Sequence, residues 1–154
     1  MRLVSDHLPP EAIAVLLNDT GVFFGDRHYA VTMTAFDDVG AVMAVAVGER
    51  KSPHDIHLSV AVRNPRAVTV RVLRKLFAAL FRDATRVTTL IDPDNLEAID
   101  RIRRMAFTYE GFLRLGLDGR RDACVYGMLK GECPWIGGHH MPRQIPLPLS
   151  VARH

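Results

Sequence analysis

The chain contains few cysteines and no long apolar run, and each absence narrows what it can be. Its only two cysteines, Cys124 and Cys133, are separated by eight residues, which argues against a disulfide framework and favours a reducing compartment. No segment approaches the run of about 18 apolar residues that a membrane-spanning helix needs. The first ten residues also lack the apolar core of a signal peptide. The sequence therefore predicts a cytoplasmic protein with no membrane partner.

Aromatic side chains and net charge are also scarce. Aromatic residues make up 7% of the chain, too few to suggest a protein that stacks single-stranded nucleic acid on aromatic platforms. The net charge is only +3, so a general affinity for nucleic acid is not indicated either. Hydrophobic residues are abundant, at 48% of 154 residues, which excludes a disordered chain and fits one domain with a real core.

The charges are divided unevenly along the chain. Residues 1–62 hold four Lys or Arg and eight Asp or Glu, whereas residues 63–121 hold thirteen Lys or Arg and seven Asp or Glu. Residues 122–154 are close to neutral, with three and two. An acidic first part and a basic middle predict that the two parts meet ligands of opposite charge.

The hydrophobic periodicity predicts an alternation of strands and helices. The clearest strand is 55–63, in which an apolar row alternates with a face that carries His57 and Ser59. Helical spacing predicts that Val70 and Leu96 face the core. The expected strands are 2–4, 28–36, 42–47, 55–63, 87–91, 107–114 and 123–129, and the expected helices are 11–19 (ended near Gly21), 69–82 and 96–105. Strand–helix–strand units of this kind predict an α/β fold, a sheet of mixed direction covered by helices.

The last eighteen residues, 137–154, differ from the rest in being rich in Gly, Pro and His. They predict an extended tail that follows a single domain at 1–136. His139, His140 and His154 could suggest a metal site, but adjacent histidines rarely chelate one ion, and no cysteine or carboxylate stands at ligand spacing from them. We therefore expect no metal.

The second half of the chain resembles the Gcn5-related N-acetyltransferase (GNAT) superfamily. The segment 92–114 is similar to the family pattern Asn–x–x–Ala … Gly–Phe–x–x–Glu–Gly–x–x–Arg, with Ala106 where Gly is usual. The matching positions are Asn95, Ala98, Phe107, Glu110, Gly111 and Arg114. Segments 57–77 and 120–136 also resemble ribosomal-protein acetyltransferases and small phage or prophage GNAT-like proteins. The resemblance covers about 55–136 and implies the GNAT fold, a mixed and mostly antiparallel sheet flanked by helices.

The resemblance also implies a site for acetyl-CoA. Its pantetheine arm would bond to the strand backbone at Ala61, Val62 and Arg63, and Asn95 would hydrogen-bond the same arm. Its pyrophosphate would lie at a helix start. The loop in question comprises Arg66, Ala67, Val68, Thr69, Val70 and Arg71. Both family glycines are absent there, replaced by Thr69 and Arg71, whose side chains either crowd the phosphates or add donors to them.

Acetyl transfer to an amine needs a proton acceptor, a polarised thioester and a proton for the leaving thiolate. His57 is the candidate base because imidazole titrates in the right range, and Ser59 lies beside it on the same strand face. The alternative is that His57 is a structural, solvated residue. The family's usual acidic Tyr position holds Ile102, so Tyr126 is the substitute we select, with Tyr109 as an alternative. Either phenol is equally compatible with a place in the core.

The resemblance thus predicts an enzyme that moves an acetyl group from acetyl-CoA to a primary amine, whether a protein N-terminus, a lysine or a small molecule. The acidic first part would then attract the cationic amine and the basic middle would hold the anionic cofactor. The alternative is a catalytically inactive GNAT-fold protein that binds coenzyme A, nucleic acid or a virion partner. A homodimer is expected only by analogy with the family.

Overall fold

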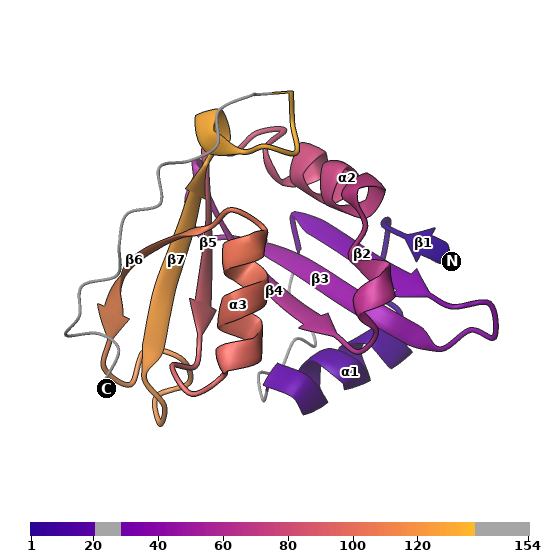
Figure 1. Ribbon diagram of the computed structural model, residues 1–154, viewed down its shortest axis with the longest axis horizontal. Helices are drawn as coiled ribbons and strands as arrows, with labels where there is room; N and C mark the ends of the chain where they lie inside the picture. The colour runs from indigo at the N-terminus through magenta and orange to yellow at the C-terminus, as the bar shows by residue number, and fades with distance from the viewer. Residues whose placement is uncertain (21–28, 138–154) are drawn as a thin grey trace.

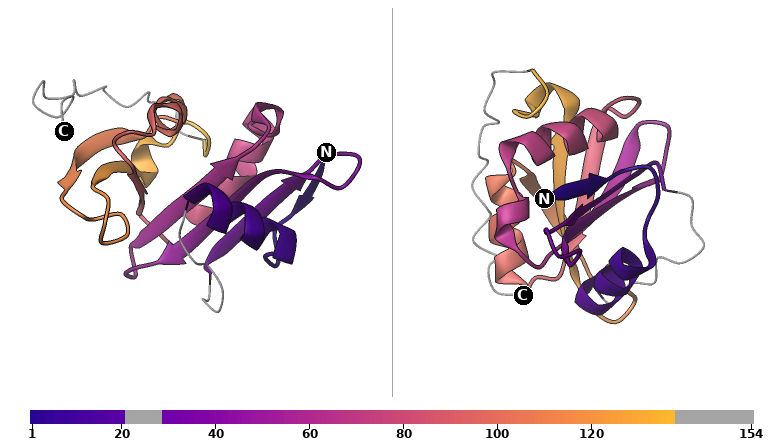
Figure 2. Two further views of the ribbon diagram at one scale, coloured as in Figure 1. Left: turned by 90° about the horizontal axis from the view of Figure 1, so that it is seen from below. Right: turned by 90° about the vertical axis from the view of Figure 1, so that its right-hand side faces the viewer.

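The computed structural model of the protein describes residues 1–20 and 29–137. One seven-stranded sheet has the order β1-β2-β3-β4-β5-β7-β6, with helix α1 against one face and helices α2 and α3 against the other (Figures 1 and 2). The strands are β1 (Arg2–Val4), β2 (Val31–Phe36), β3 (Val42–Arg50), β4 (Asp55–Val62), β5 (Arg86–Ile91), β6 (Thr108–Leu113) and β7 (Ala123–Leu129). The α-helices are α1 (Pro10–Thr20), α2 (Val70–Leu80) and α3 (Leu96–Arg104), and short 3-10 helices span Pro65–Ala67 and Lys130–Glu132.

The two helices on the second face each begin at a side-chain cap. Thr69 Oγ1 accepts the N–H of Val72 at 3.2 Å, and Asn95 Oδ1 accepts the N–H of Ala98 at 3.1 Å. Such caps satisfy donors that the first helical turn leaves without an intrahelical partner. The caps therefore define where each helix begins.

Strands β4 and β5 are the only parallel neighbours in the described sheet, and they pair over just three positions. Asp55, Ile56 and His57 pair with Arg86, Val87 and Thr88. Beyond these pairs β4 continues alongside β3 to Val62, whereas β5 continues alongside β7 to Ile91. The two strands consequently diverge from a closed vertex, and the sheet has two halves joined at that vertex.

Each face of the sheet has its own core. On the α1 face, Ala12 and Leu16 pack against Val45, Val47 and Ala61. On the other face, a larger cluster joins α2 and α3 to the sheet, and its buried members include Ile56, Leu58, Leu73, Phe77, Leu80, Val87, Ile102 and Tyr126. Burial on both faces fits the continuous apolar run at the start of β3, Val42 to Val47, whereas β2 is buried throughout although it contains Thr32 and Thr34.

Gly48 on β3 permits the close approach of α2. A Cβ added at Gly48 would lie 2.9 Å from Ile56 Cγ2 and 2.9 Å from Leu80 Cδ2. Both of those side chains are buried, so neither atom has room to move away. Gly48 is therefore a packing requirement rather than a turn residue.

The predicted α/β architecture, its mixed sheet and its order of elements are confirmed, with ends that differ by a few residues. Two inward-facing assignments are wrong: Val70 is 52% exposed and Leu96 is 73% exposed. Each is the first residue of its helix, where the chain has not yet reached the covered part of the sheet. The 3-10 helix at Pro65–Ala67 was not predicted.

Some predictions fall outside the described residues. These are the end of the first helix at Gly21, the start of a strand at His28, and the tail with His139, His140 and His154. Of the helices that the structure describes, none combines the length and the apolar character needed to cross a membrane.

We expect Gly48→Ala to destabilise the fold by about 1–3 kcal/mol, because the added methyl overpacks the contact between α2 and the sheet. Gly111→Ala is the matched control, since Gly111 also lies in a strand and a Cβ there would meet nothing within 4 Å. Chemical denaturation of both variants measures the difference. Equal stabilities would show that α2 does not rest on Gly48.

Candidate functional site

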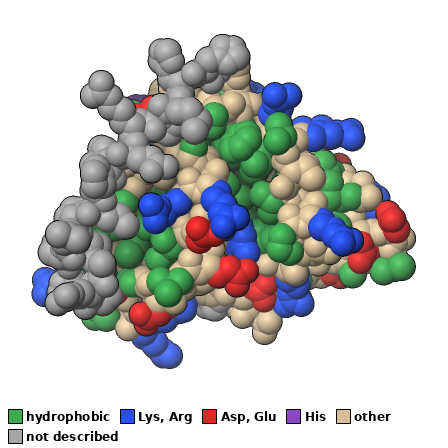
Figure 3. All heavy atoms as spheres, in the orientation of Figure 1, with side chains coloured by type: hydrophobic (Ala, Val, Ile, Leu, Met, Phe, Trp, Pro, Cys, Tyr) green, Lys and Arg blue, Asp and Glu red, His purple; other side chains and the backbone are tan. Residues whose placement is uncertain are grey.

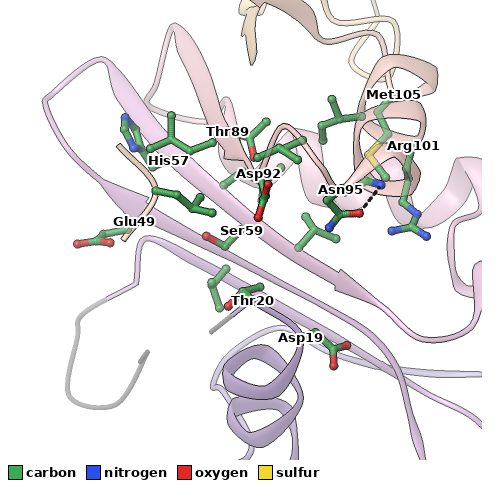
Figure 4. Close-up of a pocket in the computed structure, with 18 of the residues that line it drawn as sticks. Asp19, Thr20, Glu49, His57, Ser59, Thr89, Asp92, Asn95, Arg101 and Met105 are labelled. Carbon is green, nitrogen blue, oxygen red and sulfur yellow. Dashed lines mark hydrogen bonds between the residues drawn. The ribbon is translucent and has the colours of Figure 1, made fainter. Parts of the chain in front are cut away.

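A cavity of about 250 Å³ occupies the gap where β4 and β5 diverge. Leu58, Ser59 and Val60 of β4 face Thr89, Leu90, Ile91 and Asp92 at the end of β5 across it. Helix α3 contributes Asn95, Ala98, Arg101, Ile102 and Met105 from one face of the sheet, and Asp19 and Thr20 at the end of α1 contribute from the other (Figure 4). Because residues from both faces line one cavity, it passes between the strands as a slot.

The backbone of β4 turns hydrogen-bonding groups towards this slot. Arg63 donates its N–H to the carbonyl of Met43 at 2.8 Å, on the β3 side. Bonding direction alternates along a strand, so Ala61 also bonds towards β3, whereas Val60 and Val62 direct their backbone groups towards the gap. Of the predicted residues Ala61, Val62 and Arg63, Val62 is thus the one whose backbone faces the slot side.

Ala61 and Arg63 have other contacts. The side chain of Ala61 is buried against α1, and Arg63 forms an ion pair with Asp19 at 3.0 Å. That ion pair fixes the end of α1 to the end of β4, one rim of the slot.

A smaller apolar hollow of about 40 Å³ continues from the slot under α2. Val60 and Met105 line both spaces, and Val62, Val68 and Val72 carry the hollow towards the start of α2. Figure 3 shows this face of the molecule, where apolar side chains lie between patches of Lys and Arg. The combined path suits a flexible chain with an apolar middle and an anionic end.

The loop before α2 is closed on itself by its own hydrogen bonds. The N–H groups of Ala67, Val68 and Thr69 donate to carbonyls within the loop, each at 3.0 Å. The N–H of Arg66 donates to Asn64 Oδ1 at 3.1 Å. Because these N–H groups already donate within the loop, fewer of them can bind an anion than in a glycine-rich phosphate loop.

Two backbone N–H groups at the start of α2 can still bind an anion. Val72 is capped by Thr69, which leaves the N–H groups of Val70 and Arg71, at the first two helical positions, without an intrahelical acceptor. The side chains of Arg66 and Arg71 are both exposed beside them. Helix-end amides together with two guanidinium groups can still hold a phosphate.

Helix α3 places one amide and one arginine at the slot. Asn95 uses its Oδ1 as the cap of α3, so its side-chain NH₂ is the part that can donate to a ligand. Arg101 lines the slot as well, and its Nη2 donates to Glu97 at 2.8 Å. Ile102, at the position where the family usually has Tyr, is buried and has no group to donate.

On the α1 face, the polar side chains of the slot include His57, Ser59 and three carboxylates. In Figure 4 Ser59 lies centrally between Asp92 and Thr20, while His57 lies towards the edge near Glu49. Each carboxylate has a cationic partner: Asp19 pairs with Arg63, Glu49 with Lys51 at 3.1 Å, and Asp92 with Arg121 at 3.2 Å. The acidic part of the sequence does reach this face, but its charge is balanced pair by pair.

Arg121, in the loop between β6 and β7, ties three segments together at the slot. It donates to Asp92 and, at 2.9 Å, to Asp118, and its Nη2 also donates to the carbonyl of Thr20 at 3.2 Å. Backbone N–H groups of Arg120 and Arg121, with the Arg121 side chain, lower the pKa of Asp118 to about 2. The loop is thereby ordered by a carboxylate that stays ionised throughout the neutral range.

Five polar side chains form what we call the vertex network, at the closed end of the slot: His57, Asp55, Thr88, Arg86 and Glu110. His57 Nε2 lies 3.3 Å from Asp55 Oδ2, and Thr88 Oγ1 donates to Asp55 Oδ1 at 2.8 Å. Arg86 Nε donates to Thr88 Oγ1 at 2.9 Å, and both Nη atoms of Arg86 donate to Glu110. The network spans β4, β5 and β6 across the strand β7.

Gly127 of β7 makes room for the outer end of this network. A Cβ at Gly127 would lie 2.5 Å from both carboxylate oxygens of Glu110 and 2.6 Å from Arg86 Nη2. Glu110, which matches the family pattern, is therefore an ion-pair partner of Arg86, and the pair raises the pKa of the Arg86 guanidinium.

The predicted substitute acid Tyr126 lies elsewhere. It is buried in the core beside Tyr109, with ring centroids 5.5 Å apart, and is absent from the slot lining. Burial raises the pKa of both phenols. Cys124 is also buried, and burial raises the pKa of its thiol, which fits a structural cysteine.

The structure thus brings His57, Ser59 and Asn95 together in the slot, with the loop 66–71 at the far end of the connected path. Sequence reasoning missed Asp92, Arg101, Arg121 and Thr88. Asp92 carried a usable signal, because residues just after a strand at a divergence point commonly face the ligand. Arg121 and Thr88 had no such signal, since their roles depend on which strands are neighbours.

Comparison of the chain with known proteins agrees with this geometry. No protein-family model matches the sequence, and no curated protein matches it significantly. Among solved structures, a spermidine N-acetyltransferase mutant from Vibrio cholerae has a TM-score of 0.63 at 11% identity, covering 86% of this chain and 96% of that chain. An acetyltransferase of the GNAT family from Streptococcus pneumoniae has a TM-score of 0.58 at 14% identity, covering 83% and 99%.

A third similar structure is a ribosomal-protein acetyltransferase, the kind of protein that parts of the sequence resemble. It is the ribosomal-protein-alanine N-acetyltransferase from Brucella melitensis, 22% identical, with a TM-score of 0.51 over 64% of this chain and 68% of that chain. Identities this low establish the architecture rather than the chemistry. The strand order, the diverging β4 and β5, and these neighbours together show that the chain has the GNAT fold.

Proposed function

We propose that the protein is an N-acetyltransferase that moves the acetyl group of acetyl-CoA to a primary amine. The observation that carries the proposal is the slot between β4 and β5, lined from both faces of the sheet. A passage of this kind lets a donor enter from the α2–α3 face and an acceptor from the α1 face. The two reactants then meet between the strands, which is the geometry that direct transfer requires.

The residues present fit acetyl-CoA, although the way they would hold it differs from the usual family pattern. Val60 and Val62 offer strand backbone groups to a pantetheine arm, the apolar hollow accommodates its methyl groups, and Asn95 offers an amide. Arg66 and Arg71, with the first amides of α2, would hold the pyrophosphate. Bound acetyl-CoA supplies an activated thioester, with the coenzyme A thiol as the second product.

The α1 face supplies the groups that handle the acceptor. Ser59 lies in the middle of the slot and can hydrogen-bond an incoming amine, and His57 lies two residues earlier on the same strand face. Two residues along a strand are about 7 Å apart, which is too far for direct contact, so proton transfer between them would pass through water. We assign His57 as the base that takes the proton through such water. Tyr126 is given no catalytic part because it does not reach the slot.

The acceptor that suits the opening of the slot on the α1 face is a primary amine that carries few other positive charges. The lining carboxylates already have cationic partners, so a polycation would find little unbalanced negative charge. A protein N-terminus or a small monoamine fits better.

A second candidate function is binding of coenzyme A without catalysis. The internally bonded loop and Ile102 favour it, because they remove phosphate donors and the usual acid. It shares the same slot, so binding alone does not separate the two candidates.

Filling the slot tests whether acetyl-CoA binds there. Ala98→Trp places an indole into the cavity and should abolish acetyl-CoA binding, whereas Ala78→Trp, on the exposed side of α2, should leave it unchanged. Isothermal titration calorimetry with acetyl-CoA measures both. Undiminished binding by the Ala98→Trp protein would move the cofactor to another part of the surface.

Reversal of one charge tests the phosphate loop. Because the loop amides are mostly used internally, affinity should depend on side-chain charge, and Arg71→Glu should weaken acetyl-CoA binding at least about tenfold at low salt. Arg82→Glu, just beyond the end of α2, is the matched control. Titrations at two salt concentrations should show the difference shrink as salt rises; identical affinities of the two variants would contradict the assignment.

Removal of the imidazole tests catalysis. His57→Ala should lower kcat about 100-fold or more, the usual contribution of a general base, with little change in the affinity for acetyl-CoA. The exposed neighbour His54 gives the control His54→Ala. Thiol release with an amine acceptor measures both rates. If wild-type protein binds acetyl-CoA but releases no thiol with any amine tested, the binding-only function holds instead.

A further inference from the structure

The order of donors and acceptors in the vertex network fixes the direction of its hydrogen bonds. Arg86 is a guanidinium and can only donate, so its Nε–H points to Thr88 Oγ1, 2.9 Å away. The hydroxyl of Thr88 must then give its own hydrogen to a different acceptor. That acceptor is Asp55 Oδ1, at 2.8 Å.

This direction leaves the second oxygen of Asp55 for His57. Asp55 Oδ1 is occupied by Thr88, and the other oxygen, Oδ2, lies 3.3 Å from His57 Nε2. An ionised carboxylate only accepts, so the stable arrangement has the hydrogen on Nε2. In the neutral ring, Nδ1 is then the nitrogen with the free lone pair.

We propose that Asp55, oriented by Thr88 and Arg86, is a positioning residue that holds His57 in its Nε2–H tautomer and so makes Nδ1 the proton-accepting atom. That the proton comes from the ammonium group of the acetyl acceptor rests on the proposed function. The tautomer of His57 does not depend on the proposed function. The carboxylate also stabilises the imidazolium that forms when Nδ1 takes the proton.

The proton balance of the step is complete. The ammonium gives one proton, through water, to His57 Nδ1. The neutral amine then attacks the thioester carbonyl carbon as the C–S bond breaks, and the second amine proton goes to the leaving thiolate. His57 returns its proton to bulk solvent, so the enzyme ends the cycle unchanged.

The other charged groups near His57 do not compete for this role. Glu49 lies opposite His57 in the strand register but pairs with Lys51 at 3.1 Å. Arg86 lies 3.9 Å from Asp55 and is mainly bound by Glu110. Asp55 is thus the carboxylate that the structure, over its described ranges, places within ion-pair distance of the ring.

The hydrogen bonds of the vertex network depend on one another, so the network does more than fill space. Thr88 is buried, with 4% exposure, and its hydroxyl accepts one bond and donates another. Gly127 keeps clear the space in which Arg86 and Glu110 meet. Removal of the Thr88 hydroxyl should therefore release the orientation of Asp55 without touching the slot, whose lining does not include Thr88.

The test is the tautomer of His57, read from ¹⁵N chemical shifts of the imidazole at a pH where the ring is neutral. The His57→Gln protein identifies the resonances among the seven histidines. In wild type we expect the shift of a protonated nitrogen at Nε2 and of an unprotonated nitrogen at Nδ1. In Thr88→Val we expect a mixture of both tautomers, and in Thr88→Ser, which keeps the hydroxyl, the wild-type pattern.

Thr34→Val is the matched control for Thr88→Val. Thr34 is also a buried strand threonine, but its hydroxyl has no hydrogen-bond partner within the described ranges, so its loss should leave the His57 tautomer unchanged. Thermal unfolding of each variant checks that it is folded. If Thr88→Val does not fold, Asp55→Asn, which removes the ionised acceptor, replaces it in the same measurement.

Kinetics separate positioning from stability. Thr88→Val should lower kcat about tenfold or more while leaving the KM for acetyl-CoA unchanged. A wild-type ring protonated at Nδ1, or a folded Thr88→Val protein with the wild-type tautomer, would overturn the inference. Failure of acetyl transfer with the expected tautomer shifts would instead reject the proposed function and leave Asp55 as the group that orients His57.

Discussion

The three backbone pairs between β4 and β5 are the constraint on which the site depends. They hold two halves of the sheet together at Asp55–His57 and Arg86–Thr88, and beyond them each strand follows a different neighbour. A longer pairing would bring the ends of β4 and β5 together and narrow the slot, and without the pairing the two halves of the sheet would have no backbone ladder between them. Additional contacts brace the vertex, since the carbonyl of His54 accepts from the N–H groups of both Thr85 and Arg86 at 3.0 Å.

The divergence gives the two faces of the sheet different tasks. On the α2–α3 face, an apolar path leads from the slot to the start of α2, which matches a long ligand with a charged end. On the α1 face, polar side chains surround the opening, and Arg63 and Arg121 fix the end of α1 beside it. The vertex network lies on this second face, so the same residues that close the slot also orient His57 at its edge.

Much of the fold was accessible from sequence because it depends on local periodicity. The strand at 55–63 and the helix at 69–82 have apolar rows that only one secondary structure buries, and His57 and Ser59 were assigned to one strand face by alternation alone. What depends on neighbours across the sheet was not accessible. The ion pairs that neutralise Asp19 and Asp92 join residues 44 and 29 positions apart, and no spacing in the sequence predicts them. Likewise, Val70 and Leu96 fit the helical pattern, but they stand at helix starts that the sheet does not cover.

Amide hydrogen exchange with and without acetyl-CoA tests the central claim most directly, because it reports on the diverging strands themselves. The account predicts new protection at Val60 and Val62, around Thr89–Asp92 and at the first amides of α2, with little change in β1 and β2. Protection that is absent, or confined to segments away from the slot, would contradict the claim that the divergence of β4 and β5 forms the binding site.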